Sequence, residues 1–72
     1  MIDMQVVQSS NIEAIGYDAD THELHVRFLT SGKTYVYPGV PQEIYEGLMN
    51  APSHGVYFGQ FVKPIYTHFY IQ

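Results

Sequence analysis

Two tyrosines, Tyr35 and Tyr37, are the residues of this chain whose type and spacing are most typical of a binding site. Side chains two residues apart in a β-strand point to the same face of the sheet, so both rings are expected on one face. There they could stack on a flat ligand, and base–aromatic stacking contributes about 1–3 kcal/mol per base. The same rings could equally be core residues whose hydroxyl groups reach a polar partner. The sequence leaves these two alternatives open.

A second candidate site lies at the start of a predicted helix, at Ser53, His54 and Gly55. Backbone N–H groups at a helix N-terminus can bind an anion such as phosphate, and Tyr57 would lie beside it. Alternatively, Ser53 is the N-cap of the helix and Tyr57 a packing residue. Bound phosphate also needs positive charge nearby. The chain has three cationic side chains in all: Arg27, Lys33 and Lys63.

The four histidines do not have the spacing of a metal site. His22 and His25 are three apart in or beside a strand and so point to opposite faces, while His54 and His68 are distant in the sequence. Without cysteine the chain can form neither a disulfide nor a thiolate zinc site. A nucleophile needs a base within hydrogen-bond reach, and the sequence contains no such constellation. We therefore expect no enzymatic activity, no metal and no cofactor.

The size and charge of the chain restrict its partners. Seventy-two residues suit one domain, expected over residues 1–72. Seven acidic residues against three basic ones give a net charge of −4, which disfavours long RNA, DNA and membranes because binding to them depends on many Lys and Arg contacts. The N-terminus has no signal-peptide pattern, which predicts a cytoplasmic protein. Hydrophobic residues make up 46% of a chain too short to bury them all, and we expect a homo-oligomer.

Three antiparallel strands in a meander are expected to position the tyrosines, at residues 12–18, 22–29 and 34–37. The first strand should contain a bulge near Gly16. The second alternates well between apolar and polar residues, so we expect a core face of Leu24, Val26 and Phe28.

Two helices are expected after the strands. Residues 40–50 have the helical period, and Ile44 and Leu48 should face the core. Gly47 weakens this helix, and close packing against the sheet would explain it. The second helix should run from Ser53 to about Phe61. Its expected inner side is Val56, Tyr57, Gln60 and Phe61.

Residues 67–71 could add a short terminal strand. The predicted order β-β-β-α-α is an α+β fold with both helices on one face of an antiparallel sheet.

Four segments of the chain resemble the KTSC domain family: Ser9-Ser10-Asn11-Ile12, Tyr35-Val36-Tyr37, Val40-Pro41 and Ala51-Pro52-Ser53-His54-Gly55-Val56-Tyr57-Phe58. The family is named after the C-terminus of some lysyl-tRNA synthetases and also occurs as a free-standing small protein in bacteria and phages. The resemblance spans roughly residues 6–66. It implies a small domain without established catalytic activity, for which the attachment to the synthetase suggests RNA binding.

Two functional hypotheses follow. The first is a non-catalytic binding module for a compact nucleotide-like ligand or short RNA. Tyr35 and Tyr37 would stack on this ligand, the helix start at Ser53 would receive phosphate, and one of the three cations would neutralise charge. The alternative is a protein–protein interaction module with an acidic, Tyr-rich surface, since Tyr is enriched at interfaces. RNA binding should weaken steeply with salt, whereas an aromatic protein interface should respond little.

Overall fold

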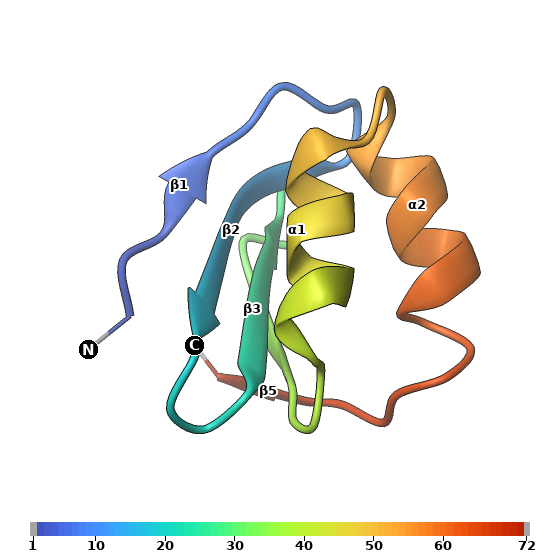
Figure 1. Ribbon diagram of the computed structural model, residues 1–72. Helices are drawn as coiled ribbons and strands as arrows, with labels where there is room; N and C mark the ends of the chain where they lie inside the picture. The colour runs from blue at the N-terminus through green and yellow to red at the C-terminus, as the bar shows by residue number, and fades with distance from the viewer. Residues whose placement is uncertain (1, 72) are drawn as a thin grey trace.

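The computed structural model describes residues 2–71 and contains, within them, one antiparallel sheet and two helices (Figure 1). The strands are β1 (Gln5–Val6), β2 (Ile12–Asp18), β3 (Glu23–Phe28), β4 (Thr34–Tyr37) and β5 (Phe69–Ile71), and the helices are α1 (Gln42–Asn50) and α2 (His54–Phe61). The strands lie in the sheet in chain order. The predicted α+β fold is therefore confirmed, including the short C-terminal strand. The two-residue edge strand β1 was not expected.

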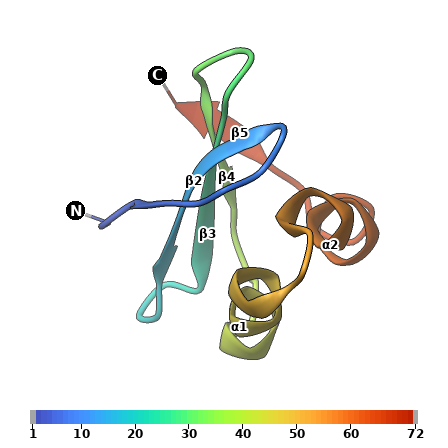
Figure 2. The same ribbon diagram turned by 90° about the horizontal axis from the view of Figure 1, so that it is seen from above.

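Both helices cover the same face of the sheet, and they lie side by side (Figure 2). The strict alternation of β3 explains this arrangement. Leu24 and Val26 point toward the helices and are fully buried. The polar residues that alternate with them along β3 point to the other side of the sheet. We call this other side the open face; on β3 it consists of Glu23, His25 and Arg27.

The core lies between the sheet and the helices. Its fully or almost fully buried members are Ile12, Ile15, Leu24, Val26, Tyr37, Val40, Leu48, Phe58 and Val62. Phe28 and Ile44 are partly buried and pack against this cluster. The predicted core residues are thus confirmed, with the two helix positions Ile44 and Leu48 facing the sheet as their spacing indicated.

The inner side of α2 differs in part from the prediction: of the four expected residues, Tyr57 is partly buried and packs against the core. Phe58 and Val62 are buried, whereas Val56 and Phe61 are 59% and 43% exposed and Gln60 is exposed as well. The sequence of α2 carries apolar residues on every side, so its spacing is compatible with two different faces. The buried face contains Phe58 and Val62, which are four residues apart. This face is buried because the Phe58 ring contacts aromatic rings of the sheet.

Two contacts hold the beginning of α1 against the sheet. The Tyr17 hydroxyl of β2 donates a hydrogen bond to the carbonyl of Val40, and its ring stacks on Tyr45 of α1 with centroids 4.7 Å apart. Burial raises the pKa of Tyr17, and the nearby Asp18 and Tyr66 raise it further. Within residues 2–71, neither helix has the length and apolar character needed to cross a membrane.

Gly16 has a different role from the one expected. The irregularity in the β2–β3 register lies between Ile12 and Ala14, not at Gly16. A Cβ atom at Gly16 would lie 2.6 Å from Ile2 Cγ2, 2.8 Å from Met4 Sδ and 2.8 Å from the backbone oxygen of Asp3. The glycine therefore allows residues 2–4, which we call the N-terminal arm, to pack directly on β2.

Candidate functional site

Tyr35 and Tyr37 lie on the helix-covered face, in an aromatic cluster. The Tyr37 side chain is only 2% exposed, and its ring contacts Phe58 and His68 at centroid distances of 5.3 Å each. Tyr35 is partly buried and contacts Phe28 at 5.2 Å and His68 at 4.9 Å. Burial, with a smaller effect of Tyr35, raises the pKa of Tyr37 to about 12. Of the two alternatives, core packing describes Tyr37, whose ring has no face available for a ligand.

The predicted anion site is built into the junction between the helices. Ser53 Oγ accepts a hydrogen bond from the Val56 backbone N–H at 3.3 Å, so Ser53 is the N-cap of α2 as expected. His54 Nδ1 donates to the carbonyl of Leu48 near the end of α1 at 2.8 Å. A Cβ atom at Gly55 would lie 2.7 Å from Asn11 Oδ1. Each of the three candidate residues therefore has a structural role, and anion binding there stays a prediction.

The hydrogen bonds of the Ser9–Asn11 segment explain why Asn11 lies so close to Gly55. Ser9 Oγ donates to Asn11 Oδ1 at 3.0 Å and accepts from the Ile12 backbone N–H at 3.3 Å. The Asn11 carbonyl accepts from the Leu29 backbone N–H at 2.9 Å. This loop is thus fixed to the sheet, and its Asn11 side chain packs against the start of α2.

The three cations are on separate elements. Arg27 lies on the open face, where its Nε donates to Thr34 Oγ1 at 3.4 Å and its Nη1 lies 3.8 Å from Glu13. Lys33 belongs to the β3–β4 turn, and Lys63 follows α2 and is exposed. Arg27 and the two tyrosines are on opposite faces of the sheet, so the structure does not assemble the predicted stacking and cationic residues into one site.

A concave surface lies on the helices at the point where α1 connects to α2. A groove of about 280 Å³ is lined by Ala51, Pro52, Ser53, Val56, Tyr57 and Gln60. We call it the helix groove. Two of these residues, Ser53 and Tyr57, are among the predicted site residues. The lining is mainly apolar and carries no charged side chain, so it is suited to an apolar group rather than to phosphate.

Gly47 brings the two helices close together beside this groove. A Cβ atom at Gly47 would lie 2.7 Å from Tyr57 Cζ. The close packing expected at Gly47 is therefore against α2, not against the sheet. The Tyr57 ring also packs on Phe61, with centroids 4.7 Å apart. Because Phe61 is itself partly exposed, the apolar surface continues from the groove toward the end of α2.

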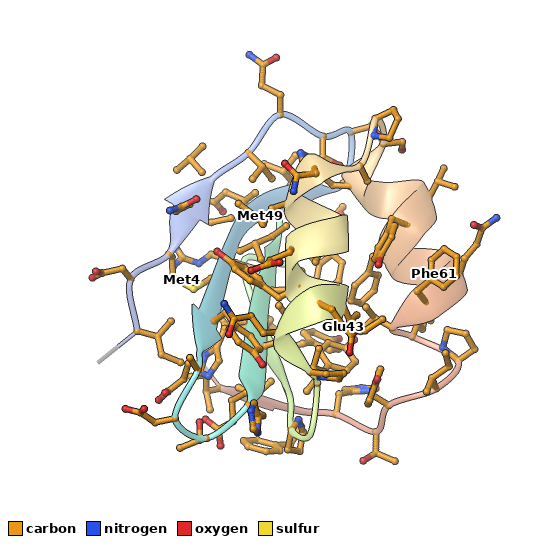
Figure 3. All side chains as sticks on the ribbon, in the orientation of Figure 1. Met4, Glu43, Met49 and Phe61 are labelled. Atoms are coloured by element: carbon orange, nitrogen blue, oxygen red, sulfur yellow. The ribbon has the colours of Figure 1, made fainter. Side chains whose placement is uncertain are left out.

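Two acidic residues, Glu43 and Glu46, lie on α1. Glu43 precedes Gly47 by one helical turn and thus lies on the stripe that faces α2; Figure 3 shows it on that side of α1, with Phe61 on α2. Glu46 is exposed on the same helix, where its carboxylate accepts a hydrogen bond from the Gln42 side chain at 3.1 Å. The lining of the helix groove is thus uncharged, and the neighbouring helix α1 carries two exposed carboxylates.

Comparisons with known proteins agree with this fold. The family model of the KTSC domain matches residues 8–66. A protein from Tsukamurella paurometabola is 48% identical over 61 residues, which cover 85% of this chain and 90% of the relative. The lysine–tRNA ligase of Nostoc punctiforme is 39% identical over 56 residues, which cover 78% of this chain and 10% of the ligase. The crystal structure of a KTSC domain protein from Yersinia pestis superimposes with a TM-score of 0.95 and 36% identity over the whole of both chains.

Proposed function

This chain belongs to the KTSC domain family, and we propose that it is a non-catalytic binding module for a basic segment of a partner protein. The observation that carries the proposal is the helix groove, which is apolar and open to the surface. Val56 and Phe61 of α2 are large apolar side chains that remain exposed, and Tyr57, which lines the groove with Val56, packs on Phe61. Contiguous exposed apolar surface with a polar border is typical of protein interaction sites.

The charge of the chain supports a basic partner. The chain carries a net charge of −4, and Glu43 and Glu46 are exposed on α1, the helix that packs against α2. Charged groups at the edge of an interface steer association and select the partner, while buried apolar groups supply most of the affinity. The proposed ligand is therefore a basic segment that inserts an aliphatic or aromatic side chain into the groove.

The distribution of the domain supports a binding role. The matched stretch is almost the whole of the Tsukamurella relative but only 10% of the Nostoc ligase. The same unit thus makes up most of one small protein and a small part of a large enzyme. This distribution favours a binding function for the unit over a catalytic one. The nucleotide-like ligand has less support, because the Tyr37 ring is buried and Arg27 lies on the other face of the sheet.

The proposal is tested by titrating labelled chain with a basic amphipathic peptide that carries leucine and tryptophan anchors. We expect amide signals of residues 51–60 to shift. Val56→Lys should weaken the affinity by about tenfold or more, because it puts a positive charge into the apolar groove. The matched control is Val6→Lys, because Val6 is 81% exposed on β1, away from the groove.

Equal binding by the two lysine variants, or signal shifts confined to residues outside 42–61, would contradict the proposal. The same variants should be titrated with a short single-stranded RNA. RNA binding that weakens steeply with salt and is indifferent to Val56→Lys would favour the nucleic-acid hypothesis instead.

A further inference from the structure

A cavity of about 510 Å³ lies on the open face of the sheet, opposite the helices. Its polar side chains come from three neighbouring strands: Asp18, Glu23, His25, Arg27 and Thr34. We call it the open-face cavity. It shares no lining residue with the helix groove, so ligand binding there is independent of the proposed function.

One end of the cavity is acidic. Asp18 and Glu23 are direct cross-strand partners in the β2–β3 register, and like charges in that position repel each other. Asp18 Oδ1 accepts the backbone N–H groups of Asp20 and Thr21 at 2.9 and 3.4 Å. Glu23 Oε1 lies 3.5 Å from His25 Nε2. A primary ammonium group bound here would offset the repulsion and could donate to both carboxylates.

The other end of the cavity is cationic. Within residues 2–71 the polar contacts of the Arg27 side chain are the two long ones to Thr34 and Glu13. A guanidinium has five N–H donors in a planar fork, which matches a carboxylate with two parallel hydrogen bonds. Arg27 therefore retains the capacity to bind an anionic group, and Thr34 Oγ1 lies next to it.

The separation of the two ends sets the length of a ligand. Glu23 and Arg27 are four residues apart on β3, so their Cα atoms are about 13 Å apart, and side chains in strands stand roughly perpendicular to the sheet. Hydrogen bonds of about 2.8 Å at each end leave roughly 7 Å for the ligand itself. His25, only 13% of whose side chain is exposed, lies midway between them.

The sides of the cavity are apolar. Ile2 and Met4 of the N-terminal arm line one side, and Ile71 of β5 lines another. The arm is held in this position by its packing on Gly16. A chain of methylene groups bridging the two charged ends would pack between these residues and lose contact with water.

From this arrangement we infer that the open-face cavity binds a small linear zwitterion, with a primary amine at one end and a carboxylate at the other. The amine is held by Asp18 and Glu23, the carboxylate by Arg27, and the methylene chain by the N-terminal arm and β5. Recognition requires both charges at their full separation. A ligand that carries only one charge contacts one end of the cavity and leaves the charged side chains at the other end without a ligand group to bind.

The test uses 6-aminohexanoate as the probe, with hexanoate and hexylamine as matched ligands that each lack one charge. Calorimetry should give an affinity for 6-aminohexanoate at least about tenfold higher than for either matched ligand. Amide signals of β3 and of the N-terminal arm should shift during the titration. Equal affinity for the three compounds, or shifts confined to α1 and α2, would overturn the inference.

Two variants locate the carboxylate. Arg27→Gln should weaken 6-aminohexanoate by about tenfold or more, because a charged hydrogen-bond donor is lost, and Arg27→Lys should retain part of the affinity. Lys63→Gln removes the same charge at an exposed position after α2 and is expected to have no effect. The inference fails if Arg27→Gln and Lys63→Gln behave alike while both retain the amide spectrum of the folded protein.

Discussion

The two faces of the sheet are made from the same strands but have opposite properties. On the helix-covered face, Leu24 and Val26 are fully buried and the rings of Tyr37 and Phe58 pack edge to face. On the open face the alternate residues of β3 are charged or polar and line a cavity. The period of two along one strand therefore places one set of residues in the core and the other on the open face, where we propose that it contacts a ligand.

This division has a consequence for mutagenesis. Substitutions of buried side chains on the helix-covered face should change the free energy of unfolding, whereas substitutions of the polar side chains that line the open-face cavity should change affinity for a ligand and leave stability nearly unaltered.

Phe58→Ala should lower the free energy of unfolding by about 3–5 kcal/mol, because it removes a buried ring that contacts two aromatic side chains of the sheet. Phe69→Ala is the matched control on β5. Phe69 is 51% exposed, so the control should cost less than about 1 kcal/mol. Urea unfolding followed by circular dichroism measures both. A smaller loss for Phe58 than for Phe69 would place the core elsewhere.

Gly16→Ala should cost about 1–3 kcal/mol through overpacking. The added methyl group would meet the backbone oxygen of Asp3 at 2.8 Å, and a backbone atom moves only if the N-terminal arm moves with it. We expect faster hydrogen exchange at β1 and weaker binding of 6-aminohexanoate, while the packing around Phe58 is unchanged. An arm that keeps its amide signals in this variant would contradict the proposed role of Gly16.

Alkaline pH should reveal the burial of Tyr37. Its pKa is raised from 10.0 to about 12 in the folded chain, so the neutral hydroxyl is favoured by folding. The resulting stability is fully present below pH 10 and is lost as the pH rises through 12. Tyr37→Phe should therefore lose less stability than the unmodified chain between these pH values. Parallel pH dependences of the two proteins, measured by urea unfolding, would show that the hydroxyl titrates normally.

The strength of each local pattern decided what the sequence could predict. Leu24 and Val26 were placed correctly because β3 alternates strictly. The inner side of α2 was misassigned because apolar residues surround that helix, and only the rings of the sheet select Phe58. Strand β1 carries no pattern of its own, since its two residues pair through the backbone with β2.

The candidate sites depend on contacts between elements that are distant in the sequence. Ser53 and Tyr57 were selected from their own segment, but the helix groove exists because α1 and α2 meet there. Arg27 was selected as a cation, yet its cavity also needs the N-terminal arm and β5. The signals that could have indicated these contacts are Gly47 and Gly16, two glycines inside regular elements where a side chain would collide with another part of the chain.

The smallest expected effect comes from comparing two helical glycines. Gly59 of α2 has no neighbour within 4 Å of an added Cβ atom, so Gly59→Ala should stabilise the chain by about 0.8–1 kcal/mol through helix propensity alone. Gly47→Ala gains the same propensity in α1, but its methyl group would meet the Tyr57 ring. The Tyr57 ring would have to rotate away from α1 to avoid this clash. The rotation removes the contact between Tyr57 and α1 and changes the shape of the helix groove.

We therefore expect no net stabilisation from Gly47→Ala and a weaker affinity for the basic peptide, whereas Gly59→Ala should leave that affinity unchanged. Thermal unfolding and peptide titration of both variants measure the difference. If Gly47→Ala stabilises the chain as much as Gly59→Ala and binds the peptide normally, the contact between Tyr57 and α1 does not shape the groove.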